Sequence, residues 1–172
     1  MGYASPERLS KRHRLDSFAC GEPALDDWLT RHARTANGAG SANVYVVTGD
    51  NDEDCVVGFH AITVGEVAKA SAPAYAARHM PAAVPVIIIG RLAVDRHHQA
   101  AGLGTALLKD AMLRALSAAE VVGARALVVH AKSERARNWY LSHGFHPAPT
   151  DEFHLWLLFK EIRAMLDLNS PN

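Results

Sequence analysis

The sequence predicts an α/β fold in which helices flank a mixed central β-sheet. Short β-branched runs alternate with amphipathic helical stretches along most of the chain, which is the pattern of this fold class. The run VPVIIIGRLAV at 84–94 is apolar enough for a strand buried on both faces. The 172 residues suffice for one domain with a substantial core. We therefore expect a single domain over 1–172.

The first half of the chain predicts four strands and one helix. The helix covers 22–36, with Pro23 near its start and the glycines of GAGS at its end. An acidic turn, GDNDED at 49–54, joins two of the strands, and a loop with one helical turn is expected over 69–85. The expected strands share alternating or β-branched residues: 8–18, 43–48, 55–67 and 84–94.

The second half predicts two further strands and three helices. Ser133 is the expected N-cap of the middle helix and Gly144 its C-terminal stop. The strands are expected at 124–131 and 153–159, and the helices at 105–122, 133–143 and 160–168.

Composition narrows the class of protein. Lysine plus arginine and aspartate plus glutamate number 18 each, so net charge gives no reason to expect a nucleic-acid partner, although local clusters remain. Cys20 and Cys55 form no C-x-x-C pair, and we expect reduced, buried thiols. No run of about 18 apolar residues could span a membrane, and no signal peptide is recognisable. We expect a cytoplasmic protein.

Glycines between a strand and a helix mark the first candidate site, QAAGLGT at 99–105. The dinucleotide fingerprint G-x-G-x-x-G fails because Leu107 stands in place of the third glycine, and the Gly-Lys-Ser/Thr of a P-loop is also missing. The loop nevertheless directs backbone N–H groups and a helix N-terminus towards one spot, which suits a pyrophosphate. A tight turn without a ligand is the alternative for this motif alone.

The second candidate site is NWYLSHGF at 138–145, where Tyr140 lies near a helix end. Taken alone, such a tyrosine is most often simply a packed aromatic residue. Together, however, RLAVDRHHQAAGLGTALL and NWYLSHGF resemble the GNAT family of acetyl-CoA-dependent N-acetyltransferases, at the expected separation of one helix and one strand. The resemblance implies the GNAT fold and an enzyme that uses acetyl-CoA.

The same resemblance implies residue roles. Tyr140 is the candidate acid that protonates the departing CoA sulfur, because a phenol keeps its proton at neutral pH. Ala100 departs from the family, which often has glycine there. The residues implied in cofactor binding are Leu92, Ala93, Val94, Gln99, Ala100, Ala101, Gly102, Leu103, Gly104, Thr105 and Asn138.

A narrower resemblance lies upstream, in CGEPALDDWLTRHARTANGAGSANVYVV. Its C-G-x-x-x-L-D-x-W-L opening is similar to the start of GNAT toxins of bacterial toxin–antitoxin pairs. That branch acetylates the amino group of aminoacyl-tRNA and so blocks translation, and its partner is a small ribbon-helix-helix antitoxin. Homodimerisation is also expected. The alternative is that Leu25, Trp28 and Leu29 are only the buried face of an amphipathic helix.

No clear carboxylate base is evident. Glu66, near the end of a strand, is possible, but we expect it at the surface. An α-amine, with a pKa near ~8, needs less help to lose its proton than a lysine near ~10.4, so the missing base favours an α-amine acceptor. The histidines lack metal-ligand spacing, and no metal site is expected.

Two basic groups could contact RNA: Lys132, Arg135 and Arg137 in one, and Lys11, Arg12 and Arg14 with Arg31 and Arg34 in the other. Ordinary solvated charges are the alternative. Two other functions also remain open: a GNAT enzyme for a small-molecule amine or a protein N-terminus, and a non-catalytic domain that binds CoA or a partner.

Overall fold

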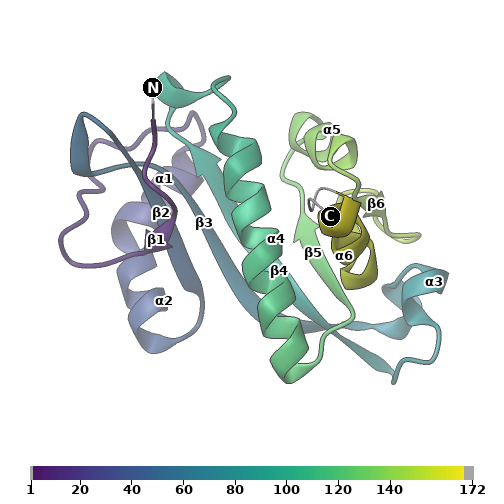
Figure 1. Cartoon of the computed structure of the whole chain (residues 1–172). Coiled ribbons are helices and arrows are strands. Elements are labelled where there is room, and N and C mark those ends of the chain that lie inside the picture. Colours follow the sequence, from purple (N-terminus) through teal and green to yellow (C-terminus); the bar gives the residue numbers. More distant parts are fainter. Residues whose placement is uncertain (1, 169–172) are drawn as a thin grey trace. The chain divides into compact units, whose positions relative to one another are not determined.

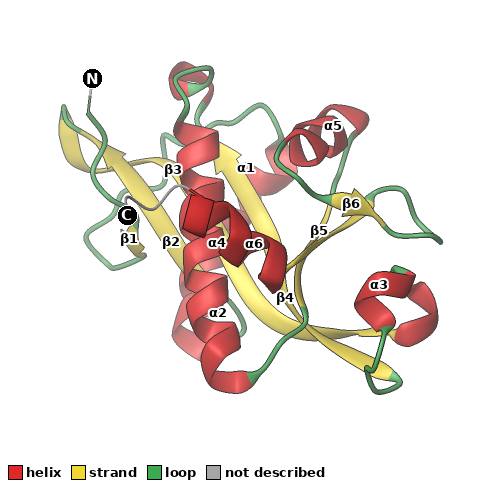
Figure 2. Ribbon diagram, turned by 45° about the vertical axis from the view of Figure 1, so that its right-hand side comes forward, coloured by secondary structure: helices red, strands yellow, loops and turns green. Residues whose placement is uncertain are grey.

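The computed structural model describes residues 2–168. It contains a mixed seven-stranded sheet, in the order β1-β2-β3-β4-β5-β7-β6, with flanking helices (Figures 1 and 2). This is the predicted α/β class. The strands are β1 (Glu7–Arg8), β2 (Asn43–Gly49), β3 (Asp52–Ala68), β4 (Ala83–Val94), β5 (Ala126–His130), β6 (His146–Pro147) and β7 (His154–Leu158). The α-helices are α1 (Pro23–Arg31), α2 (Ala33–Ala39), α3 (Ala74–Ala77), α4 (Leu103–Val122), α5 (Glu134–Ser142) and α6 (Phe159–Leu168).

The described residues form two compact units, the first comprising residues 2–63 with 90–111, and the second 64–89 with 112–168. In the first unit, β2 pairs antiparallel with β1 and β3. Its core is built around Leu29 and Phe59, which are both fully buried. Trp28 stacks on Phe59 with ring centroids 6.1 Å apart. Helix α1 begins at Pro23, whose fixed φ suits a first helical position.

Two predictions for this unit were wrong. Of the expected strand 8–18, only Arg8 lies in a strand, namely β1. The buried residues Leu9, Leu15 and Phe18 do not follow the two-residue period of a strand, so turns connect them instead. The expected helix 22–36 is interrupted at His32, whose ψ of -23° and φ of -120° separate α1 from α2.

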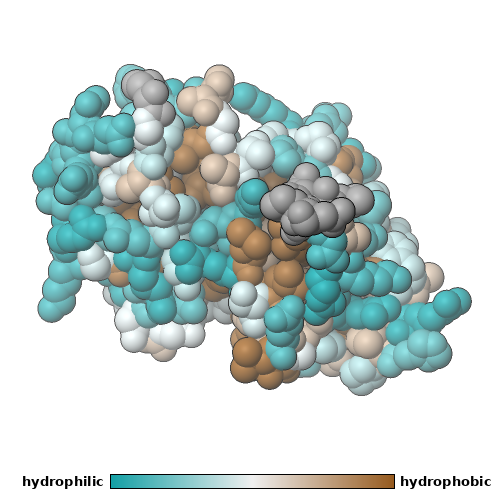
Figure 3. Space-filling model, in the orientation of Figure 1, coloured by the Kyte–Doolittle hydropathy of each residue, from teal (hydrophilic) through white to brown (hydrophobic). Residues whose placement is uncertain are grey.

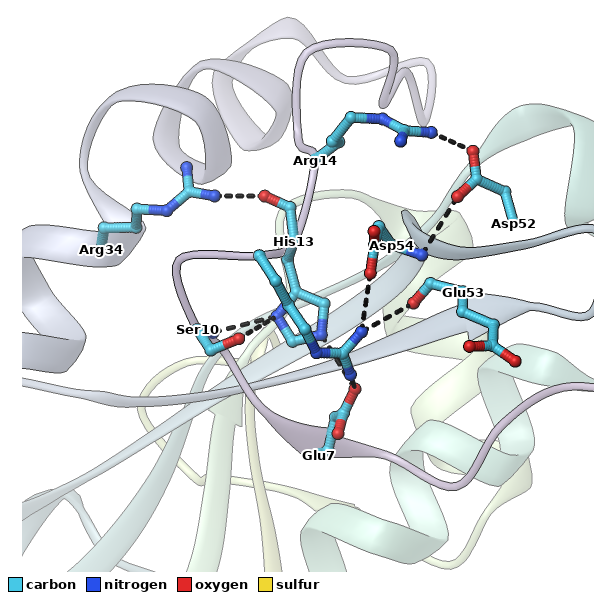
Figure 4. Close-up of polar contacts among 9 residues, drawn as sticks. Glu7, Ser10, His13, Arg14, Arg34, Asp52, Glu53 and Asp54 are labelled. Atoms are coloured by element: carbon cyan, nitrogen blue, oxygen red, sulfur yellow. Dashed lines mark hydrogen bonds and ion pairs between the residues drawn. The ribbon is translucent and has the colours of Figure 1, made fainter.

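A polar network fastens the N-terminal segment to the start of β3 (Figure 4). Arg12 pairs with Glu7 and, at 2.9 Å, with Asp54. Arg14 pairs with Asp52. His13 is buried and its Nε2 lies 2.9 Å from a Glu7 carboxylate oxygen. The acidic turn seen in the sequence therefore neutralises two of the arginines that were expected near RNA.

In the second unit, β5 runs parallel to β4 and antiparallel to β7, and Val86 lies opposite Ala126. Trp156 and Leu158 of β7 are buried in its core. The edge strand β6 was not predicted, because two residues that end at a proline carry no strand pattern. The remaining elements were predicted to within a few residues at each end.

Ser133, the two cysteines and Glu66 each carried a prediction about their place in the fold. Ser133 Oγ accepts from Ala136 N at 3.1 Å, which confirms the predicted N-cap of α5. Cys20 and Cys55 are free, but both are half-buried rather than buried. Glu66 is exposed, as expected.

Among residues 2–168, no helix combines the length and the apolar composition that crossing a bilayer requires.

Candidate functional site

The glycine loop follows the end of β4 and leads into the first half of α4; residues 90–111 all belong to the first unit. A short 3-10 turn, Arg96–His98, comes first. Ala100 then has φ 64° and Gly102 has φ 83°, so the chain bends through the left-handed region twice before α4 begins. A Cβ on Gly102 would meet nothing within 4 Å. Glycine is therefore favoured at 102 by backbone conformation and not by crowding.

Ala100 is the residue at which the sequence departs from the family pattern. A non-glycine residue in the left-handed region costs about 1–2 kcal/mol, and glycine would remove that cost. The departure therefore leaves the bend in place and adds strain to it.

Gly104 is the second residue of α4, because the helix begins at Leu103, two residues before the predicted start. The N–H of Ala106 donates to Gly102 O at 3.1 Å in the first helical turn. Amide groups in the first turn of a helix have no carbonyl partner inside the helix, and the helix dipole adds positive potential there. The loop thus presents the local chemistry that an anion needs.

A hollow of about 350 Å³ adjoins this loop. Sequence reasoning missed its other wall, which comes from the N-terminal segment; Tyr3 also meets His98, with Oη 3.1 Å from Nδ1. No local pattern signals a contact between residues 95 positions apart. The hollow is lined by Tyr3, Ala4, Ser5, Pro6, Val47, Ala101, Gly102, Leu103 and Ala106.

The end of β4 carries three further residues that were predicted to bind acetyl-CoA. Ala93 is buried, and Leu92 and Val94 are half-buried. Just before them, the Arg91 guanidinium carbon lies 4.2 Å from the centroid of the Trp28 ring, a cation–π contact. Partial burial lowers the pKa of Arg91, yet an arginine keeps its charge at neutral pH.

The loop is also hydrogen-bonded to the segment that precedes α1. Gln99 Nε2 donates to Cys20 O and to Val94 O, both at 2.9 Å. Asp95, which is 6% exposed, accepts from Ala19 N at 3.0 Å. Both hydrogens of the Gln99 side-chain amide are thus directed at carbonyl oxygens within the protein.

Tyr140 lies on α5 in the second unit and is 6% exposed. Its ring makes edge contacts with Trp139 and Phe145, at centroid distances of 4.9 and 5.4 Å. Burial raises the pKa of Tyr140, so the phenol is protonated at neutral pH. No described residue forms a hydrogen bond with its hydroxyl. Asn138 is exposed, and its Oδ1 accepts a long 3.4 Å contact from Arg137.

The predicted RNA-contact residues differ in how much of their charge is free. Arg31 pairs with Asp27 at 2.9 Å, Arg34 donates to the backbone oxygen of His13, and Arg137 Nε donates to Glu152 O at 2.9 Å. Lys132 and Arg135 are exposed and have no ion pair or hydrogen-bond partner among residues 2–168. Lys11 is likewise exposed and has no such partner among the described residues, so these three are the most available cations of the set.

Sequence reasoning also missed a buried polar pair in the first unit. His60 is fully buried in β3, and its Nε2 lies 2.8 Å from Asp110 Oδ2 of α4. The ring stacks on Tyr45 at a centroid distance of 5.2 Å. The sequence does show a histidine inside an apolar strand, which indicates that its ring has a hydrogen-bond partner but not which residue that partner is. Within the part of the chain that the structure describes, no three His, Cys, Asp or Glu side chains are arranged to hold a metal ion.

Known proteins resemble the chain over nearly its whole length. Residues 40–147 match the family model described as an acetyltransferase (GNAT) domain. A tRNA-acetylating toxin from Mycobacterium tuberculosis is 44% identical over 165 residues, which cover 96% of this chain and 98% of that protein. A probable toxin TacT from Sinorhizobium fredii is 27% identical and covers 90% of each chain.

Solved structures agree with this match. The structure of AtaT complexed with acetyl-methionyl-tRNAfMet has a TM-score of 0.88 and 29% identity, and covers 96% of this chain and 99% of that one. A tyrosine-to-phenylalanine variant of AtaT, bound to the C-terminus of the antitoxin AtaR and to acetyl-CoA, has a TM-score of 0.81 and 27% identity, with coverage of 97% and 99%. The chain belongs to the GNAT family of acetyltransferases.

Proposed function

We propose that this GNAT enzyme is a toxin that transfers the acetyl group of acetyl-CoA to the amino group of aminoacyl-tRNA and so blocks translation. The observation that carries the proposal is 44% identity, over 96% of the chain, to a tRNA-acetylating toxin. The similarity to AtaT in complex with acetyl-methionyl-tRNAfMet supports the same acceptor class. The toxin-like opening at Cys20–Leu29 supports it from the sequence.

Acetyl-CoA is the donor, and its pyrophosphate binds the glycine loop. The two left-handed residues, Ala100 and Gly102, set the bend that leads into the N-terminus of α4. Backbone N–H groups of residues 99–105 supply hydrogen bonds without introducing a cation. Leu92, Ala93 and Val94 contribute backbone groups that polarise the thioester carbonyl. One similar structure is AtaT with AtaR and acetyl-CoA, and another is AtaTR with acetyl-CoA, which supports acetyl-CoA as the donor.

Transfer requires one bond to form and one to break. The neutral amine attacks the thioester carbonyl carbon, the new C–N bond forms, and the C–S bond breaks. Tyr140 gives its phenolic proton to the departing thiolate, and the proton that the amine loses returns to the phenolate through solvent. A protonated phenol with no hydrogen-bond partner among the described residues is suited to this role. Asn138 orients the donor.

The acceptor needs little help to lose its proton. The exposed Glu66 forms no hydrogen bond or ion pair with another described residue that would orient it as a base. An α-amine with a pKa near ~8 is partly neutral without a base.

Five cations contact the RNA phosphates: Lys132, Arg135, Arg137, Arg31 and Arg34.

The assembly follows the relatives. AtaT has been solved bound to the C-terminus of AtaR, and a small ribbon-helix-helix antitoxin is the corresponding partner of this chain. Homodimerisation has support in the second unit. Leu113, Val121 and Val122 of α4 are 42%, 84% and 66% exposed, and Figure 3 shows apolar surface over the C-terminal half of α4. Exposed apolar patches commonly mark association surfaces. Residues 1–172 act as one cytoplasmic GNAT domain.

The decisive experiment incubates purified protein with radiolabelled acetyl-CoA and total aminoacylated tRNA. Label should enter the tRNA fraction and disappear after mild alkaline hydrolysis of the aminoacyl ester. Deacylated tRNA, free amino acids and N-terminal peptides are the parallel acceptors. Faster labelling of free amines or peptides would replace the tRNA assignment. No labelling of any acceptor, despite binding of acetyl-CoA, would favour a non-catalytic binding domain.

A further inference from the structure

The segment Ala19–Glu22, which precedes α1, is bound to the donor loop, defined here as residues 95–102. Three hydrogen bonds connect them. Ala19 N donates to Asp95 Oδ2 at 3.0 Å, Arg96 N donates to Ala19 O at 2.8 Å, and Gln99 Nε2 donates to Cys20 O at 2.9 Å. All of these residues belong to the first unit. The donor loop is therefore fixed at its start and in its middle by a segment almost eighty residues earlier in the chain.

Asp95 fixes the start of the donor loop. Its side chain is buried and its two oxygens accept from different backbone N–H groups, Ala19 N and His97 N, each at 3.0 Å. No described cation forms an ion pair with it. A buried carboxylate satisfied only by N–H groups is held in one orientation by their directions.

Gln99 fixes the donor loop immediately before its strained bend. Its side-chain amide bridges Cys20 O and Val94 O, so it joins the end of β4 to the segment before α1. The next residue, Ala100, has φ 64°, a conformation that alanine does not favour by itself. Strained backbone persists where its surroundings over-determine it, and Gln99 provides two of those constraints.

Asp26 of α1 forms a further hydrogen bond with the segment that precedes this helix. Its Oδ1 accepts from Cys20 N at 2.9 Å. Cys20 is thus held on both sides of its backbone, by Asp26 at its N–H and by Gln99 at its carbonyl. Cys20 and Asp26 are two of the positions that define the toxin-like opening of the sequence.

We propose that Asp26 and Gln99 are positioning residues for the acetyl donor, which act through the Cys20 backbone to hold the donor loop in its pyrophosphate-binding conformation. The toxin-like opening, from Cys20 to Asp26, then serves the donor side of the reaction. This inference rests on the proposed role of the loop in binding acetyl-CoA. It does not depend on which amine accepts the acetyl group.

Paired substitutions separate the hydrogen bonds from the bulk of each side chain. Gln99→Met keeps length and neutrality but removes both N–H donors, whereas Gln99→Arg retains side-chain N–H donors at this position. Asp26→Ala removes the acceptor for Cys20 N, whereas Asp26→Asn keeps an oxygen there. Removal of one or two hydrogen bonds should raise the Kd for CoA and the KM for acetyl-CoA about tenfold in Gln99→Met and Asp26→Ala. Gln99→Arg and Asp26→Asn should recover most of the affinity.

Two readouts identify a positioning role. The kcat of Gln99→Met and its KM for the amine acceptor should stay within about threefold of the wild type, since the Gln99 side chain does not touch the reacting atoms. Asp27→Ala is the matched control, because Asp27 neighbours Asp26 on α1 but its carboxylate pairs, among the described residues, only with exposed Arg31. This variant should leave CoA affinity unchanged. Circular dichroism and thermal melting verify that every variant is folded.

The inference fails if folded Gln99→Met binds CoA as the wild type does. It also fails if the KM for the acceptor rises while CoA affinity is unchanged, because the segment would then serve the acceptor. Calorimetry with CoA needs no acceptor, so its result is independent of the tRNA proposal. CoA affinity that follows the hydrogen bonds, in a protein that labels no tRNA, would overturn the proposed substrate and retain the positioning role. A wild-type protein that does not bind CoA would overturn both.

Discussion

His60 Nε2 donates to Asp110 Oδ2 across 2.8 Å, from a ring that is fully buried. An ionised carboxylate only accepts hydrogen bonds, so the proton lies on Nε2. The other ring nitrogen, Nδ1, has no partner in the described structure. The hydrogen bond to Asp110 therefore compensates the burial of this imidazole. The pair joins β3 to α4, the helix that begins at the donor loop.

Asp110→Ala should lower the free energy of unfolding by about 2 kcal/mol, because it leaves the His60 imidazole without either hydrogen-bond partner. Urea denaturation followed by circular dichroism measures the change. Asp27→Ala serves as the control, since an exposed i,i+4 pair contributes about 0.3–0.5 kcal/mol. Equal decreases in the two variants would show that the buried pair adds no more than a surface pair.

Gly104→Glu should abolish binding of acetyl-CoA while the protein stays folded. The substitution places bulk and negative charge in the first turn of α4, where the pyrophosphate is proposed to bind. An acidic residue near a helix N-terminus is itself favourable, so stability should hardly change. Calorimetry with CoA provides the measurement. Near-normal affinity in the folded variant would remove the pyrophosphate from this loop.

Tyr140→Phe should keep CoA affinity and lower the rate of acetyl transfer by about 10²–10⁴-fold, the range for removal of one general acid. The ring contacts with Trp139 and Phe145 survive the change. Burial raises the pKa of Tyr140, so its phenol should remain protonated up to at least pH ~10, the value for an unperturbed tyrosine. A wild-type rate in the variant would make Tyr140 only a packed aromatic.

The fold was largely predictable because its elements carry local patterns. The run 84–94 predicted β4, and Ser133 with Gly144 predicted both ends of α5. The strand expected over 8–18 failed for the opposite reason. Its conformation depends on Arg12 and Arg14, which pair with carboxylates about forty residues later, and on apolar residues that are not spaced as in a strand. Local propensity carries no information about such long-range pairs.

Some features of the candidate site could be predicted from local sequence, and others could not. Gly102 could be predicted because a left-handed bend before a helix selects glycine. The side-chain role of Gln99 could not, since its partner Cys20 lies 79 residues away. His60 and Asp110, 50 residues apart, were missed likewise. Sequence motifs identify backbone conformations that one residue type satisfies, whereas pairs of ordinary polar residues require the folded chain.

Cys20 should react slowly with iodoacetamide at pH 8 and progressively faster towards pH 11. Burial, followed by the contact with Asp26, raises the pKa of the Cys20 thiol to about 11, and only the thiolate is a nucleophile. Mass spectrometry of the Cys55→Ser variant follows this thiol alone. Rapid alkylation at pH 8 would show that the Ala19–Glu22 segment opens in solution, because an open segment would expose Cys20 to solvent.

Replacing Lys132 and Arg135 together by glutamine should weaken binding of aminoacyl-tRNA and reduce its dependence on salt. These two cations are exposed and have no partner among the described residues, so both are available to bind phosphates. For each phosphate that the variant no longer binds, the slope of log K against log salt should fall by roughly 0.7–0.9, and CoA affinity should not change. The matched control replaces Arg12 and Arg14, whose charges already face Glu7, Asp54 and Asp52; its slope should equal that of the wild type. A reduced slope in the control alone would place the RNA along the N-terminal segment instead of the start of α5.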